Sequence, residues 1–296
     1  LSQYFDIFSL MTDFQQIYIV ALEMDNEELS SIFFFILSLF GAIINALVLL
    51  CIQQNPLRCF RNTSSYLVAH QTFSDLVTSM FIAGYSIATF CDISITEKFS
   101  TVLRIFVVLS VTGFIALFLV SFDRFLAIRF PIRYRIYVKS QLVIAVILPI
   151  WLGTVGMILL IAYNGALYST ISQFLVVFGG ILVFIKLCLH CLAFWTIKKK
   201  GDGIQRSTSQ PSSHQNQQMV TLKRESRFLF TVFLITLVVL ISTVPFLSVF
   251  YHSHSVGSTV KTAVFALYWS GVILGPCIYF LRLNNYYTSL KTIICL

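Results

Sequence analysis

The ionisable residues beside or inside long apolar runs are the ones whose chemistry is most telling in this chain. Asp123 and Arg124 close an uncharged run, Ile105–Phe122, and a basic segment follows them. Charged groups at the end of such a run mark either an anchor at a membrane boundary or a switch. The guanidinium of Arg124 stays protonated and can pair with a carboxylate on its own or another helix. The stretch therefore predicts ion-pair chemistry.

Glu225 is the predicted partner of Arg124 on another helix. It precedes Pro245 by twenty residues, which corresponds to roughly 30 Å along a helix at about 1.5 Å per residue. This distance places Glu225 at the same end of a helical bundle as Arg124. The pair would hold two helices together, and breaking it would open a cavity for a partner. The alternative is that Arg124 only marks the membrane boundary.

Asp75 and Lys186 are charged residues expected deep inside apolar spans. The carboxylate of Asp75 needs polar partners in the interior of a bundle. Lys186 either reaches toward Asp123 or Tyr279, or extends along its own stem to the cytosolic side, and we favour the second. His, Cys, Asp and Glu residues show no spacing typical of a metal site or of a nucleophile with its base. We therefore predict neither an enzyme nor a cofactor.

The composition predicts an integral membrane protein. Of the 296 residues, 57% are hydrophobic and 11% are charged, and the mean hydropathy is +0.86. A soluble domain with so few charges could not cover its apolar surface. The net charge of +8 does not indicate nucleic acid, because no Lys or Arg precedes Arg58 and the basic residues then gather in alternate loops. Such loops are typical of the cytosolic side of a membrane, where anionic lipids lie.

The predicted fold class is an all-α membrane protein, a seven-transmembrane helix bundle with a short C-terminal membrane-surface helix. Each apolar run has about the length that crosses a bilayer as a helix, about 20 residues. We expect an extracellular tail or a surface segment at residues 1–30, the bundle at 31–281, and a cytosolic tail with the surface helix at 282–296. The polar segment 198–227 is expected to be a flexible loop. The expected spans are about 32–52, 66–90, 101–128, 142–163, 173–197, 228–251 and 262–281.

The segment DRFLAIRFPIRY, residues 123–134, resembles the aspartate–arginine–tyrosine signature and following loop of rhodopsin-like (class A) G protein-coupled receptors. Phe125 stands where that family has its tyrosine. A short second outer loop without cysteine, and a fifth span without proline, are similar to those of melanocortin, cannabinoid and lysolipid receptors. Further positions that match the family's span signatures are Asn45, Asp75, Trp151, Pro245 and the segment Gly275–Tyr279.

The resemblance implies a plasma-membrane receptor with its N-terminus outside the cell and its C-terminus in the cytosol. An extracellular ligand would signal to a heterotrimeric G protein through an outward movement of the sixth helix. Pro245 and Pro276 would act as hinges, because a proline removes a backbone hydrogen bond from its helix. Ile132 would insert into the G protein. The switch and coupling residues would be Asp123, Arg124, Phe125, Ile132, Glu225 and Tyr279.

The same resemblance implies a core polar network at Asn45 and Asp75. A sodium ion beside Asp75 is not favoured, because Gly113 and Gly275 stand where the family offers polar side chains. Cys295 follows the expected surface helix and is a candidate for palmitoylation, with a free cysteine as the equal alternative.

The expected ligand pocket is apolar and aromatic. The third span has no aspartate for an amine near its outer end, and the seventh span has no lysine for retinal. A lipid-like or peptide ligand therefore fits better than a monoamine, although the same side chains would also serve helix packing. Thr243 replaces the bulky tryptophan of the family, so the coupling from ligand to core must differ here. The pocket candidates are Phe106, Val107, Ser110, Phe246, Tyr268 and Trp269.

Two other classes of protein compete with a signalling receptor. A seven-helix transporter or pump needs several buried ionisable groups along one path, and only Asp75, Lys186 and His70 are available. A receptor-like protein that no longer signals is the closer alternative, because Thr243 and Gly275 depart from the family pattern. The partners that we expect are an extracellular ligand, a G protein and membrane lipids, without nucleic acid.

Overall fold

The computed structural model describes residues 27–60, 62–91, 99–163, 168–206, 213–251 and 257–294. This part of the chain is helical and contains no strand. Seven of its helices are long and apolar enough to cross a membrane, so the predicted all-α, seven-helix fold is confirmed. Of the expected N-terminal tail, residues 1–26 lie outside the described residues, as does Cys295, whereas residues 27–30 already belong to the first described helix. The helices are α2 (Glu27–Gln54), α3 (Thr63–Phe90), α4 (Phe99–Arg129), α5 (Pro131–Tyr137), α6 (Ser140–Tyr163), α7 (Tyr168–Arg206), α8 (Ser213–Tyr251), α9 (Ser258–Arg282) and α10 (Asn284–Ile294).

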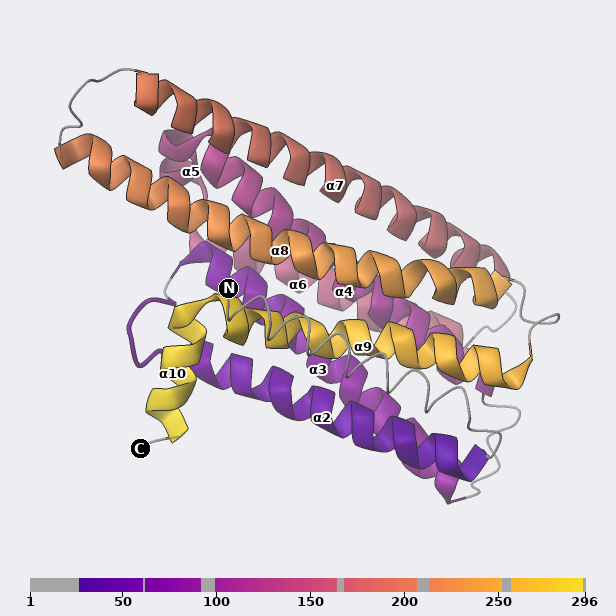
Figure 1. The fold of residues 1–296 in the computed structure, drawn as a ribbon. Helices are drawn as coiled ribbons and strands as arrows, with labels where there is room; N and C mark the ends of the chain where they lie inside the picture. Colours follow the sequence, from indigo (N-terminus) through magenta and orange to yellow (C-terminus); the bar gives the residue numbers. More distant parts are fainter. Residues whose placement is uncertain are drawn as a thin grey trace.

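The seven long helices lie side by side in one bundle (Figure 1). The most extensive packing joins α2 to α3, α4 to α7, and α8 to α9. Helices α4 and α9 are central, because 56% and 67% of their most apolar stretches are buried, whereas α6 is peripheral with 11%. Helices α5 and α10 both lie at the end where α2, α4, α7 and α9 finish (Figure 1). We call this the basic end, because the basic residues of the segments between spans gather there.

Helices α7 and α8 extend far beyond the apolar stretches that the sequence delimits. The expectation of a flexible loop over residues 198–227 is wrong, because α7 continues to Arg206 and α8 already begins at Ser213. Residues 207–212 lie outside the described part. Helix α5 likewise occupies a segment that the sequence suggests is loop. Lys, Arg, Gln, Glu and Met favour helix, and a helix satisfies its own backbone, so polarity alone does not end it.

A tight connection fixes the start of α3. Asn55 ends α2 with a positive φ of 45°, and its side-chain oxygen accepts a hydrogen bond from the backbone of Phe60 at 3.0 Å. Asn62 then caps α3 by accepting from the backbone N–H of Ser65 at 2.9 Å. Asparagine suits both positions, because it tolerates a left-handed backbone and is a preferred helix cap. The first residues of α3 are thereby held at the basic end, beside α4 and α5.

Two apolar clusters fill the interior. The cluster nearer the basic end includes Val120 of α4, Val232 of α8 and Tyr279 of α9, and it takes in Tyr286 of α10. The cluster toward the opposite end is mainly aromatic, with Phe106, Phe246, Tyr268 and Trp269 among its members. Burial of these large side chains is the main contribution that holds the helices in register. Polar residues and cavities lie between the two clusters.

Candidate functional site

An ionic cluster of Asp123, Arg124 and Glu225 lies at the basic end of the bundle. Arg124 Nη2 lies 2.6 Å from Asp123 Oδ2, and Arg124 Nη1 lies 3.2 Å from Glu225 Oε2. The side chains of Asp123 and Arg124 are 4% and 11% exposed, whereas that of Glu225 is 24% exposed. The structure thus brings together the three residues that the sequence suggested. Within this cluster, the contact between Arg124 and Glu225 joins α4 to α8.

Asp123 is held by side chains from two further helices. Ser64 of α3 donates a hydrogen bond to Asp123 Oδ2 at 2.8 Å. The hydroxyl of Tyr134 in α5 donates to Asp123 Oδ1 and also contacts Thr63. Burial, together with the negative charge of Asp123, raises the pKa of Tyr134. Tyr134 therefore remains a neutral hydrogen-bond donor throughout the physiological pH range.

The two contacts of Arg124 differ in strength. Its contact with Asp123 is short, is made by both Nε and Nη2, and is almost fully buried. Its contact with Glu225 is longer and reaches a half-buried carboxylate on another helix. The Phe228 ring lies 5.1 Å from the Arg124 guanidinium carbon and covers it. Because screening weakens exposed pairs most, the contact between α4 and α8 is the weaker of the two.

The other predicted switch residues lie apart from the ionic cluster. Phe125 packs beside Ile128 of α4, Ala193 of α7 and Leu229 of α8, in a small apolar cluster. Ile132, in α5, is 75% exposed. Tyr279 is 1% exposed, so it is a core residue and not part of the surface around Arg124.

Tyr279 instead belongs to a polar chain in the core. Its hydroxyl donates to Gln71 Oε1 at 3.3 Å, and Gln71 also lines the small cavity that contains Asp75, one helical turn further along α3. Asn45 does not join this chain. Its amide donates to the Gly41 carbonyl at 2.9 Å, and its Oδ1 has no partner within the described residues. The described residues thus include no direct hydrogen bond between Asn45 and Asp75, and the expected core polar network of these two residues stays a prediction.

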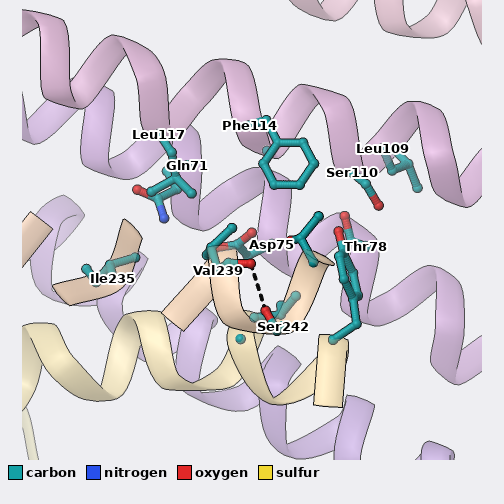
Figure 2. Close-up of a pocket in the computed structure, with 15 residues that line it drawn as sticks. Gln71, Asp75, Thr78, Leu109, Ser110, Phe114, Leu117, Ile235, Val239 and Ser242 are labelled. Atoms are coloured by element: carbon teal, nitrogen blue, oxygen red, sulfur yellow. Dashed lines mark hydrogen bonds between the residues drawn. The ribbon is translucent and has the colours of Figure 1, made fainter. Parts of the chain in front are cut away.

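A small cavity of about 40 Å³ surrounds Asp75, enough for a few water molecules. Its walls come from α3, α4, α8 and α9 (Figure 2). Ser242 in α8 donates to the Val239 carbonyl at 3.0 Å beside it (Figure 2). A polar space of this kind lowers the cost of a carboxyl group in the interior. In the described part of the chain, no group of three or more His, Cys, Asp or Glu residues could hold a metal ion.

A larger cavity of about 330 Å³ lies between α4, α7 and α8, with Tyr268 of α9 at its edge. Four of the six predicted pocket residues line it: Val107, Ser110, Phe246 and Tyr268. The other two do not, because Phe106 and Trp269 are each 1% exposed and pack against each other with ring centroids 6.0 Å apart. Sequence position could not separate lining from packing here, since that depends on the rotation of each helix.

Lys186 is 2% exposed in the interior of the bundle. The expectation that it extends to the cytosolic side is wrong, because it precedes Lys198 by twelve residues, roughly 18 Å of helix, which a lysine stem cannot span. Within the described residues it forms no hydrogen bond or ion pair, either with Asp123 or with Tyr279.

One helical turn beyond Lys186, His190 joins three helices in a contact that the sequence analysis missed. The Nε2 of His190 lies 3.3 Å from Ser121 Oγ of α4 and 3.2 Å from Thr236 Oγ1 of α8. His190 is fully buried. A histidine within an apolar span was the available signal.

Pro245 and Pro276 lie inside α8 and α9, as their positions in the sequence imply. Their action as hinges stays a prediction. The six cysteines of the described residues are all free, and only Cys91 lies at the end of the bundle opposite α5 and α10.

Residues 35–170, a little under half of the chain, match the model of a family described as the serpentine type 7TM GPCR chemoreceptor Srx. No curated protein matches the chain. With the seven-helix bundle, this similarity supports a GPCR-like serpentine receptor and a multi-pass membrane protein. The family is not a class of enzymes. The match does not single out rhodopsin-like class A receptors or the melanocortin and cannabinoid group, so those finer assignments stay predictions.

Proposed function

We propose that the protein is a plasma-membrane receptor that passes a ligand signal from outside the cell to a heterotrimeric G protein. The observation that carries this proposal is the ion pair between Arg124 of α4 and Glu225 of α8, at 3.2 Å. The pair lies where a partner on the basic side would dock. The basic end would face the cytosol, in accord with the charge rule for membrane proteins, and the N-terminus would lie outside.

The proposed activation step moves α8 away from α4. A ligand in the larger cavity lies between these helices and α7, so it favours arrangements in which α8 is displaced. The contact between Arg124 and Glu225 then breaks, while Asp123 keeps Arg124 in place. The G protein enters the space that opens, in contact with Arg124 and with the exposed apolar side chain of Ile132. Pro245 lies within α8 and is the proposed hinge.

The test measures G protein activation in cells that express the chain or a variant at matched surface levels. Glu225→Gln removes the charge that pairs with Arg124, so basal activation is expected to rise several-fold. Arg124→Ala is expected to abolish activation. Asp202→Asn removes an exposed carboxylate of α7 at the same end and should leave basal activation unchanged.

Two outcomes would contradict the proposal. Unchanged basal activation in Glu225→Gln, in a receptor that does couple, would show that the pair is not a lock. The absence of any response from every G protein class, with the chain folded at the surface, would instead favour a receptor-like protein that no longer signals.

A further inference from the structure

The two cavities share one wall. Ser110 and Phe114 of α4, Thr243 of α8 and Tyr268 of α9 line both the small cavity around Asp75 and the larger apolar cavity. Three of these four residues carry hydroxyl groups. Ser110 donates to the Phe106 carbonyl at 2.8 Å, and Tyr268 lines the same wall.

The hydroxyl of Thr243 is the unusual group in this wall. Thr243 is 7% exposed, and its Oγ1 has no hydrogen-bond partner in the part of the chain that the structure describes. Other buried threonines of α8 donate to the carbonyl one turn earlier, as Thr231 and Thr236 do at 2.8 and 2.7 Å. A buried hydroxyl without a partner is costly. Thr243 lines both cavities, while Oγ1 itself is covered. A rotation about the Cα–Cβ bond, which exchanges the methyl and hydroxyl positions, turns Oγ1 toward a molecule bound there.

The rest of the larger cavity is apolar and reaches the outer face of the bundle. Among the described residues, those that line it carry no charge. Phe184 of α7 and Val244 of α8 belong to the lining, and they are also 68% and 58% exposed on the surface that the bilayer covers. Gly180, one helical turn before Phe184 and also in the lining, has no atom within 4 Å of the position that a Cβ would take. The cavity therefore borders the hydrocarbon layer between α7 and α8.

We propose that the larger cavity binds a small neutral molecule with an apolar body and a single hydroxyl or carbonyl group. The apolar body lies between α4, α7 and α8, and the polar group hydrogen-bonds Thr243 Oγ1. The molecule reaches the cavity from the bilayer, through the gap between Phe184 and Val244. This inference rests on the proposed receptor function and names the class of its ligand.

The other ligand classes fit the cavity less well. A charged ligand would lose its hydration without gaining a counter-ion in the lining. A volume of about 330 Å³ lies at the lower end of the range for small-molecule pockets, about 300–1,000 Å³, and does not enclose a peptide. The unpartnered hydroxyl of Thr243 in a lining without charge matches a neutral ligand with a hydrogen-bonding group.

The position of Thr243 also links the ligand to the core. Its side chain separates the ligand from the cavity that contains Asp75 and Gln71, and Gln71 accepts a hydrogen bond from Tyr279 of α9. A ligand that engages Thr243 therefore acts on α8 two residues before Pro245, the proposed hinge. In the rhodopsin-like family that the sequence resembles, a tryptophan at this position couples the ligand to the core. Here the hydroxyl of Thr243, together with the ligand that fills the cavity, would provide that coupling.

The test uses the purified full chain in phosphatidylcholine nanodiscs. An octanol that carries a photoreactive diazirine is added, and peptide mass spectrometry locates the labelled residues. Labels are expected on the lining segments of α7 and α8. Excess 1-octanol or 2-octanone should compete for labelling, and n-octane should compete several-fold less.

Paired variants separate the hydroxyl from the cavity. Thr243→Val keeps the shape and removes the hydroxyl, so competition by 1-octanol should weaken by about two- to ten-fold, the effect of one hydrogen bond, while that by n-octane is unchanged. Thr243→Ser should keep the preference for octanol. Val183→Phe fills the cavity and should remove labelling, whereas Ile185→Phe, on the bilayer-facing side of α7 and outside the lining, should retain it. Thermal denaturation of each variant shows that it is folded.

Labels spread evenly over the bilayer-facing surface and insensitive to Val183→Phe would overturn the proposal. Equal competition by octane and octanol would overturn the role of Thr243.

A series of alcohols from hexanol to hexadecanol distinguishes two sources of the ligand. Competition that peaks at short chains indicates a small external molecule, and competition that rises to the longest chain indicates a bilayer lipid whose tail passes between α7 and α8. The assay contains no G protein, so labelling without signalling contradicts the receptor proposal alone, and signalling with scattered labelling contradicts this inference alone.

Discussion

Asp123 receives hydrogen bonds from three helices and so holds Arg124 independently of Glu225. Its carboxylate accepts from Arg124 of α4, Ser64 of α3 and Tyr134 of α5. Loss of the contact with Glu225 therefore leaves the charge of Arg124 paired, which avoids the large cost of an isolated buried ion. One contact of Arg124 can break while the other persists, and this difference suits a switch better than an anchor.

Tyr134→Phe is predicted to weaken this arrangement in a pH-dependent way. The substitution removes the hydroxyl that donates to Asp123, at a cost of about 1 kcal/mol in unfolding free energy at neutral pH. The pKa of Tyr134 is raised in the folded chain, so its contribution is fully present below the unfolded pKa, about 10, and is lost as the pH rises through the folded value. Thermal denaturation of both chains from neutral to strongly alkaline pH measures the difference. A difference that stays constant above pH 10 would contradict the prediction.

The sequence predicts the contact between Arg124 and Glu225 because distance along two helices fixes the level of each residue in a bundle. It does not predict the roles of Gln71 and Thr243. Gln71 reaches Tyr279 only because α3 and α9 are rotated so that these two side chains face each other. The free hydroxyl of Thr243 depends on the absence of the usual bond to the preceding turn, which is a property of its side-chain rotamer.

At the scale of elements, α10 packs on the bundle mainly through the aromatic side chain of Tyr286, with Leu290 and Ile293 against the same apolar cluster. Tyr286 is 4% exposed and lies against Phe60 and Tyr279, with ring centroids 4.7 and 5.7 Å away. Tyr286→Ala is predicted to cost about 3 kcal/mol of docking free energy, which is about a hundred-fold in the undocking constant. Amide hydrogen exchange in α10 measures this change. Tyr287→Ala is the matched control, because Tyr287 is 59% exposed, and equal exchange in both variants would show that Tyr286 does not hold the helix.

Close packing of α8 on α9 depends on Gly271. A Cβ at this position would lie 2.8 Å from Ser242 Oγ, so Gly271→Ala must turn the hydroxyl away from its hydrogen bond with the Val239 carbonyl. The expected cost is about 1 kcal/mol in unfolding free energy, measured by denaturation in detergent micelles. Adding Ser242→Ala should remove most of that cost. Gly153→Ala, where a Cβ meets nothing within 4 Å, should be neutral or slightly stabilising, since alanine favours helix.

The lengths of α7 and α8 show where sequence reasoning about elements succeeds and fails. Their apolar stretches are evident from composition, because a bilayer demands about 20 apolar residues. Their polar extensions, over residues 198–206 and 213–227, are not bounded by hydropathy. In water a helix ends where capping residues or tertiary contacts terminate it. The number of spans is therefore easier to predict from the sequence than the ends of these two helices.

At the scale of the whole molecule, the ion pair and the cavities combine residues from the matched part of the chain with residues beyond it. The family match covers residues 35–170, which include Arg124 and the α4 side of both cavities. Glu225, Thr243 and Tyr268, which complete the ion pair and the cavity walls, all lie beyond it. Both the proposed switch and the larger cavity are therefore built from the matched part and from the part beyond it. Central helices α4 and α9 connect the two.

The orientation of this bundle is predicted to show in its native cysteines. Cys91 is exposed at the end opposite α5 and α10, so a membrane-impermeant maleimide applied to intact cells should label Cys91 alone. Cys188 and Cys191 are exposed on the apolar part of α7, where the bilayer excludes the reagent. Cys59 lies at the basic end, and burial raises the pKa of its thiol, which lowers the reactive thiolate fraction. Labelling of Cys59 should therefore require permeabilised cells and proceed slowly. Cys91→Ser is expected to abolish labelling of intact cells, and labelling that persists in this variant would reverse the proposed topology.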